Sequence, residues 1–176
     1  GESGSGKSTL LNVLAGLENP TSGVVLFNEI PIWDLREQER AAIRKDKFAI
    51  IFQSFNLINS LTVWENISFH ARLCKKWDPK LAKELITSSG LLGLENRYPD
   101  QISGGQQQRV AILRAIMAKP EVLFADEPTG NLDDKNSQIV IQILLEMTNL
   151  IGATLLVATH SHSFASRLDI VLKLEN

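Results

Sequence analysis

Short apolar runs, separated by segments of helical character, recur along the chain. The runs lie at residues 48–52, 122–125 and 154–158, and apolar runs of this length are typical of strands buried on both faces of a sheet. Predicted helices lie between them. Because strands that alternate with helices form βαβ units, the pattern predicts an α/β fold with a mostly parallel sheet flanked by helices.

Turn and capping residues bound the remaining predicted elements. Residues 55–100 contain no clear strand, so we expect a helical subdomain, about residues 55–118, inserted into the core of the sheet. The other expected elements are helices over 7–15, from a cap at Asp34 to about Lys45, over most of 62–93, from Ser103 to Met117 and over about 136–149, with short strands at 24–27 and 170–174.

Composition limits the classes of protein that the chain can represent. With 176 residues and no repeat or linker, we expect one domain over residues 1–176. The net charge of −2 and the pI near 5.9 argue against a nucleic-acid partner, because such proteins usually carry a basic excess. The single cysteine, Cys74, excludes an internal disulfide. No apolar run approaches the roughly 20 residues of a membrane helix, and no signal peptide is visible at the start.

A glycine-rich segment opens the chain and precedes a predicted helix. It fits the pattern G-x-x-x-x-G-K-[ST], in which backbone N–H groups turn around a phosphate and the helix adds the positive end of its dipole. Lys7 is expected to reach the β- and γ-phosphates, and Ser8 to bind Mg²⁺. A glycine-rich turn without a ligand is the alternative. The predicted nucleotide-binding residues are Gly1, Glu2, Ser3, Gly4, Ser5, Gly6, Lys7, Ser8 and Thr9.

Two acidic residues follow the strand predicted at 122–125. Asp126 is expected to hold Mg²⁺ and Glu127 to polarise the attacking water, because alternation along a strand points the two side chains in different directions. Such a pair could instead cap the turn at residues 128–130. The phosphate-binding pattern upstream favours the catalytic interpretation.

A second helix N-terminus suited to phosphate lies at residues 102–107. Ser103 is a good N-cap, and Gly104 and Gly105 would let a ligand approach the exposed N–H groups ahead of Gln106. One chain rarely needs two such cradles. A head-to-tail dimer does, because the loop of one subunit closes on the nucleotide held by the other. An ordinary capped helix is the alternative.

Three candidate groups directly follow apolar runs, namely Gln53, the pair Asp126 and Glu127, and His160. In a parallel sheet they would gather at the carboxyl edge, where open α/β folds bind ligands. The chemistry that fits is transfer of a phosphoryl group to water, achieved by positioning and charge stabilisation. The remaining histidines, His70 and His162, are expected to be packed or solvated rather than to bind a ligand.

Together these segments resemble the motif series of ABC ATPases, a family with a P-loop NTPase fold. The resemblance implies that Gln53 contacts Mg²⁺ or the lytic water, that His160 contacts the γ-phosphate and holds Glu127, and that Asp133 communicates across the dimer. It is closest to the bacterial branch of lipoprotein-release, macrolide-export and cell-division ATPases. The residues that carry it are Lys7 and Ser8, Gln53, ISGGQ at 102–106 with Ile102 where leucine is usual, ADE at 125–127, Asn131-Leu132-Asp133 and His160.

The resemblance implies hydrolysis of ATP, with Mg²⁺, in a head-to-tail dimer that drives a membrane permease, in this branch an exporter of lipoprotein or peptide-type substrates. The expected partners are transmembrane permease subunits and a second copy of the chain or a homologous ATPase subunit. The expected location is peripheral, on the cytoplasmic face of the inner membrane. The alternative is a soluble or regulatory ABC-type ATPase, acting in cell-division signalling or on DNA, ribosomes or iron–sulfur assembly.

Two further expectations follow from the resemblance. Members of the family carry, before the P-loop, the strand that enters it and an aromatic residue that stacks on adenine. A chain beginning at Gly1 is therefore expected to fold poorly and to bind ATP weakly by itself. A hydrophobic groove lined by Phe55, Leu57 and Leu61 is hypothesised to receive the permease.

Overall fold

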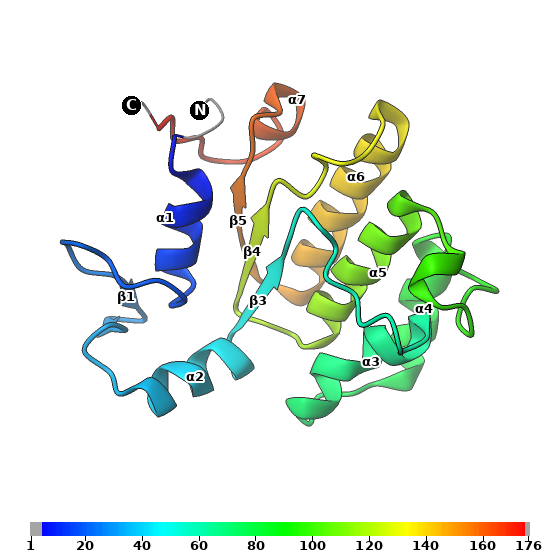
Figure 1. Ribbon diagram of the computed structural model, residues 1–176, viewed down its shortest axis with the longest axis horizontal. Coiled ribbons are helices and arrows are strands. Elements are labelled where there is room, and N and C mark those ends of the chain that lie inside the picture. Colours follow the sequence, from blue (N-terminus) through cyan, green and yellow to red (C-terminus); the bar gives the residue numbers. More distant parts are fainter. Residues whose placement is uncertain (1–4, 175–176) are drawn as a thin grey trace.

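The computed structural model describes residues 5–174, and a three-stranded parallel sheet in the order β3-β4-β5 forms its centre (Figure 1). The predicted α/β fold with a parallel sheet is confirmed. The strands are β1 Leu26–Phe27, β2 Ile30–Pro31, β3 Phe48–Ile51, β4 Val122–Asp126 and β5 Thr154–Ala158. The helices are α1 Lys7–Leu14, α2 Glu37–Asp46, α3 Val63–Leu73, α4 Pro79–Ser88, α5 Gly104–Met117, α6 Asp134–Ile151 and α7 His162–Ala165, with a 3-10 turn η1 at Pro99–Gln101.

Parallel pairing joins three segments that are far apart in the sequence. At one end of the sheet Phe48 aligns with Val122 and Val122 with Thr154, and the strands continue in register toward their carboxyl ends. The residues that follow each strand therefore meet at one edge of the sheet. This edge holds the ends of β3, β4 and β5, where the sequence placed its candidate groups.

Alternation along the strands sends side chains into two separate cores. On one face Phe48 and Phe124 pack with Leu11 of α1, and the two rings meet edge to face with centroids 5.2 Å apart. On the other face Ile51 and Leu123 join a larger core with α3, α5 and α6. Figure 1 shows α1 on one side of the sheet and α5 and α6 on the other. Both faces of β3 and β4 are thus covered, as the unbroken apolar runs predicted.

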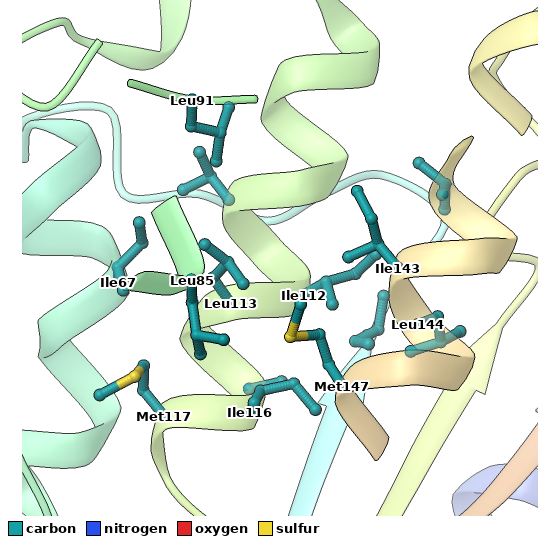
Figure 2. Packing of buried hydrophobic residues seen from close by; sticks show 14 of the residues in the cluster. Ile67, Leu85, Leu91, Ile112, Leu113, Ile116, Met117, Ile143, Leu144 and Met147 are labelled. Atoms are coloured by element: carbon teal, nitrogen blue, oxygen red, sulfur yellow. The ribbon is translucent and has the colours of Figure 1, made fainter. Parts of the chain in front are cut away.

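The larger core lies where α5 packs between α6 and the helices α3 and α4 (Figure 2). Ile112 and Ile116 of α5 lie beside Met147 of α6, while Leu113 lies beside Leu85 of α4. All five side chains are buried. Because burial of a side chain such as Leu or Ile contributes about 1.5–3 kcal/mol, this core holds α5 firmly against its neighbours.

The helix predicted to start from a cap at Asp34 begins later, so that assignment was wrong. The N-cap of α2 is Arg36, whose backbone N–H donates to Glu39 Oε2 at 3.0 Å. The N–H of Asp34 donates instead to the carbonyl of Pro31 in the preceding turn. The Glu39 carboxylate, three residues after the cap, satisfies the N–H group of Arg36 itself and fixes the start of the helix at Glu37.

The helical region predicted over 62–93 is two helices, α3 and α4. The chain turns between them at Lys75, which has a φ of 57°, and Asp78 then caps α4 by accepting from the N–H groups of Lys80 and Leu81. Along the chain α3, α4 and α5 all lie between β3 and β4.

Two predicted strands differ from the structure. Within residues 24–27 only Leu26–Phe27 is a strand, and it pairs antiparallel with β2. Residues 170–174 form no strand, and Ile170 and Leu172 are 78% and 83% exposed. A strand needs a partner for its N–H and C=O groups. Within residues 5–174 neither this segment nor the outer edge of β5 has one.

Candidate functional site

The helix α1 presents its N-terminus at the carboxyl edge of the sheet. Gly6 caps it with a φ of 79°, a left-handed conformation that favours glycine, and accepts the N–H of Leu10 at 2.8 Å. Lys7 Nζ lies 3.4 Å from Ser5 Oγ, and Thr9 is exposed in the first turn. A helix N-terminus with a lysine beside it suits an anionic phosphate. The predicted Gly1, Glu2, Ser3 and Gly4 lie outside the described residues.

Ser8 and Asp126 are brought together although 118 residues separate them. The hydroxyl of Ser8 donates to Asp126 Oδ1 at 2.9 Å. Asp126 is the last residue of β4, and α1 packs against β4 and β5. A hydroxyl and a carboxylate are hard oxygen ligands, and Mg²⁺ is usually bound by one or two such groups together with phosphate and water. The two side chains therefore fit the predicted metal site.

The side chain of Glu127, the residue after Asp126, meets His160 instead of Ser8. Its Oε2 lies 2.9 Å from His160 Nδ1 and 3.4 Å from the backbone N of His160. The backbone N–H of Glu127 donates to the carbonyl of Ala158 in β5, which holds the residue at the end of the sheet. The side chain of Glu127 is 14% exposed and that of His160 is 66% exposed. A sheltered carboxylate with an oriented partner suits a general base.

Glu127 has a φ of 44°, which is unusual for a residue with a side chain. It starts a turn in which Gly130 N–H donates to its carbonyl at 3.0 Å. A Cβ at Gly130 would lie 2.7 Å from Gln53 Nε2, so the Gln53 amide would have to shift to accommodate one. Gln53 Nε2 donates to Asn131 Oδ1 at 3.3 Å, and Asn131 Nδ2 donates back to the carbonyl of Gln53 at 3.0 Å. The loop after β3 is thereby tied to the loop after β4.

The second predicted phosphate site, at residues 102–107, is the capped N-terminus of α5. Ser103 Oγ accepts the N–H of Gln106 at 3.3 Å, and Gln106 Oε1 accepts the N–H of Ser103 at 2.8 Å. A Cβ on Gly104 would make only ordinary contacts, with the ring of Phe55 at 3.6 Å and Leu132 Cδ2 at 3.9 Å. Within one copy α1 and α5 cover opposite faces of the sheet (Figure 1).

Gly105 has an intramolecular reason to be glycine that the sequence did not reveal. Its Cβ would lie 2.5 Å from Asn136 Oδ1. Asn136 is held in turn by Asp133, which accepts its backbone N–H at 2.8 Å and its side-chain Nδ2 at 2.7 Å. These hydrogen bonds, led by that from the backbone of Asn136, lower the pKa of Asp133 below its ordinary range. Within one chain the predicted dimer residue Asp133 is therefore the N-cap of α6.

The sequence did not reveal the role of Arg114 either, because no local pattern marks it. Its guanidinium donates to the carbonyls of Phe55 and Asn56 at 3.1 and 2.7 Å. Both of those residues have a positive φ, so the arginine supports the unusual loop that follows Gln53. Burial lowers the pKa of Arg114.

A cleft of about 410 Å³ lies beside this loop, with Phe52, Ile58 and Phe69 among its apolar walls and Arg44 and Arg114 among its basic ones. The hypothesised groove residues Phe55, Leu57 and Leu61 do not line it. Leu57 packs against the larger core, and the ring of Phe55 lies against Gly104, because the turn after Gln53 directs both inward.

The remaining histidines occupy structural positions. His70 Nε2 lies 3.0 Å from the carbonyl of Lys45, and burial lowers the pKa of His70. His162 is exposed at the first position of α7. Among residues 5–174, no helix combines the length and the apolar character needed to cross a bilayer.

Known proteins are similar to the chain in sequence and in fold. Residues 1–130 match a family model described as ABC transporter. The chain is 45% identical over 178 residues to an uncharacterized ABC transporter ATP-binding protein of Mycobacterium tuberculosis, a match covering 99% of this chain and 72% of that protein. It is 42% identical over 179 residues to the uncharacterized ABC transporter ATP-binding protein YbbA of Escherichia coli, covering 100% and 78%.

Solved structures agree with these matches. The dimeric ATP-binding cassette MJ0796, bound to ADP and Pi in a post-hydrolysis state, gives a TM-score of 0.81 at 39% identity, covering 93% of this chain and 74% of that one. The protein cbiO1 of Clostridium perfringens, part of the ABC transporter complex cbiONQ, gives a TM-score of 0.79 at 31% identity, covering 92% and 65%.

Proposed function

The chain belongs to the ABC transporter family as an ATP-binding subunit, and on that premise we propose that its head-to-tail dimer hydrolyses ATP to drive a membrane permease. Hydrolysis of ATP is the activity of this family, and the similar cassette MJ0796 was solved with both products bound. The motif strings that resemble lipoprotein-release and macrolide-export ATPases favour an exporter, working from the cytoplasmic face of the inner membrane. The inserted helices, about residues 55–118, would form the subdomain that faces the permease.

The proposed chemistry assigns one task to each group at the edge of the sheet. The N-terminus of α1 and Lys7 hold the phosphates, and Mg²⁺ held by Ser8 and Asp126 would neutralise phosphate charge when bound. Glu127 accepts a proton from the attacking water, and His160 holds the Glu127 carboxylate from 2.9 Å and reaches toward the γ-phosphate. Gln53 would contact Mg²⁺ or the lytic water and sense the membrane partner through its loop.

The observation that supports the proposed dimer is that the two helices with phosphate-suited N-termini, α1 and α5, lie on opposite faces of the sheet. Within one copy α1 and α5 cover opposite faces of the sheet, so we expect their N-termini to lie too far apart to grip one triphosphate together. In a head-to-tail pair, the Ser103 end of one copy would close on the nucleotide bound at Lys7 of the other. Two such sites would form for each dimer.

A disulfide crosslink tests this arrangement in the full-length protein. The native Cys74 is replaced by Ser, and cysteines are placed at Ser5 and at Gly104, where a Cβ fits at 3.6 Å from its nearest neighbour. We expect a crosslinked dimer with Mg-ATP when Glu127→Gln prevents turnover, and none with ADP. Each single-cysteine variant serves as the control. The dimer is contradicted when the double-cysteine protein binds ATP and never crosslinks under any nucleotide condition.

The permease would dock at the cleft beside α3. Phe69 is 41% exposed at its wall and Leu73 follows one turn later on the same helix at 55%. Exposed apolar side chains next to the basic groups Arg44 and Arg114 suit a short cytoplasmic segment with apolar and acidic residues.

Rebinding to native membranes stripped of peripheral proteins tests the docking. We expect Phe69→Asp to abolish saturable rebinding while the affinity for ATP stays unchanged. Leu150→Asp is the matched control, since Leu150 is also exposed but lies at the end of α6. Equal rebinding of both variants, or rebinding that survives proteolysis of the membrane proteins, contradicts the docking and favours a soluble or regulatory ATPase.

A further inference from the structure

One buried glutamine connects α5 to the turn that carries Glu127. Gln108 is 0% exposed, and its Nε2 donates to the carbonyl of Pro128 at 2.7 Å. Its Oε1 is also buried and has no hydrogen-bond partner in the described part of the chain. A buried amide with one orphan atom is costly for stability. The hydrogen bond from the Gln108 amide to the Pro128 carbonyl therefore points to a role of Gln108 beyond packing.

The carbonyl of Pro128 belongs to the central peptide of the turn that carries Glu127. The turn runs from Glu127 to Gly130 and is closed by the hydrogen bond between those two residues. The peptide between Pro128 and Thr129 is its central unit, and the orientation of the central peptide is what distinguishes one turn type from another. The hydrogen bond that closes the turn does not use that carbonyl, and Gln108 Nε2 is the donor that binds it.

The other end of this connection is the start of α5. Gln108 lies five residues after Ser103 on the same helix, and α5 is held rigidly in the larger core. Any displacement of the Ser103 end therefore reaches the Glu127 turn through a helix and one short hydrogen bond. We infer that Gln108 is a positioning residue for hydrolysis, which aligns Glu127 with the position of the α5 N-terminus. The inference rests on the proposed function.

Gln108→Met tests the inference, because Met has a similar shape and lacks the amide. In the full-length protein we expect kcat for ATP hydrolysis to fall about three- to tenfold, the effect of one neutral hydrogen bond. The KM for ATP and the unfolding midpoint should stay close to those of the unmodified protein, since the orphan Oε1 is removed as well. Thr148→Val is the matched control. Thr148 is buried in α6, and its Oγ1 donates to the carbonyl of Leu144 far along the helix from the site.

Single-turnover rates in the Glu127→Gln background separate positioning from mere structure. If Gln108 acts through Glu127, adding Gln108→Met there causes no further loss. A similar loss in both backgrounds, or a kcat unchanged by Gln108→Met, overturns the inference. Normal hydrolysis by Glu127→Gln alone would instead overturn the proposed role of Glu127, so the two failures are distinguishable.

Gln108→Glu keeps the inference testable if the Met variant does not fold. A protonated carboxyl can donate to the carbonyl of Pro128, whereas a carboxylate cannot, and burial raises the pKa of a glutamate. The kcat of this variant relative to the unmodified protein should therefore rise as the pH falls from about 8 to about 6. A ratio that does not change with pH overturns the inference.

Discussion

Replacing Gly105 by alanine tests the contact that joins the start of α5 to the start of α6. The added Cβ would lie 2.5 Å from Oδ1, 2.8 Å from Cγ and 3.2 Å from Cβ of Asn136. Contacts between such atoms need about 3.5–4.0 Å, so the Asn136 side chain must retreat by about 1 Å. Rotation alone would break its hydrogen bond to Asp133. The neighbouring helix must therefore shift or a hydrogen bond must be lost.

The magnitude follows from two opposing effects. Overpacking of this kind costs about 1–3 kcal/mol, and alanine regains up to about 1 kcal/mol over glycine in a helix. We expect Gly105→Ala to lower the free energy of unfolding by about 1–2 kcal/mol, which corresponds to about 2–8 °C in the melting temperature of a domain of this size. Urea denaturation and calorimetry of the full-length protein measure both quantities.

Two variants test whether the contact with Asn136 causes the loss of stability in Gly105→Ala. Gly104→Ala is the control at the adjacent position, where the Cβ meets a ring carbon at 3.6 Å, and it should be neutral or slightly stabilising. In an Asn136→Ala background the space opens, so Gly105→Ala should no longer be destabilising. The reasoning is refuted if Gly105→Ala costs no more than Gly104→Ala, or costs the same with and without Asn136.

Three further predictions concern the chemistry and the pH dependence. Glu127→Gln should keep ATP affinity while phosphate release falls at least about a hundredfold, the usual effect of a general base; normal release would remove Glu127 from that role. Ser8→Ala should weaken ATP binding about tenfold or more with Mg²⁺ present and leave binding in EDTA unchanged, and an equal loss in both conditions would argue against a metal ligand. Because burial lowers the pKa of His70 below its ordinary 6.5, the unfolded chain takes up a proton first, so stability should fall as the pH drops below 6.5. His70→Gln, which keeps a donor for the Lys45 carbonyl, should flatten that dependence, and a slope that is equally steep in both proteins would contradict it.

Caps and apolar runs were readable from the sequence because they depend on residues within a turn or two of one another. Ser103 caps α5 as predicted, and Gln106 completes the cap by accepting the Ser103 N–H. The apolar runs at residues 48–52 and 122–125 became β3 and β4, with Phe48 and Phe124 facing one core and Ile51 facing the other. The register of a parallel sheet then brought the residues after each strand to one edge, as expected.

Sequence reasoning failed where an element depends on a distant partner. Residues 170–174 are apolar enough for a strand, yet pairing is what makes a strand, and within residues 5–174 they pair with nothing. Arg114 supports Phe55 and Asn56 from a helix that begins about fifty residues later. No local sequence pattern indicates such a contact.

The sequence by itself determined the fold class, the chemical inventory and the order of the motifs, because spacing and hydrophobic period are short-range properties of the chain. Only the tertiary structure decided that Gly105 makes room for Asn136, that Glu127 adopts a φ of 44° and that Gln108 reaches Pro128. The contacts of Gly105 with Asn136 and of Gln108 with Pro128 join residues 20 or more positions apart. They depend on how whole helices pack against the sheet.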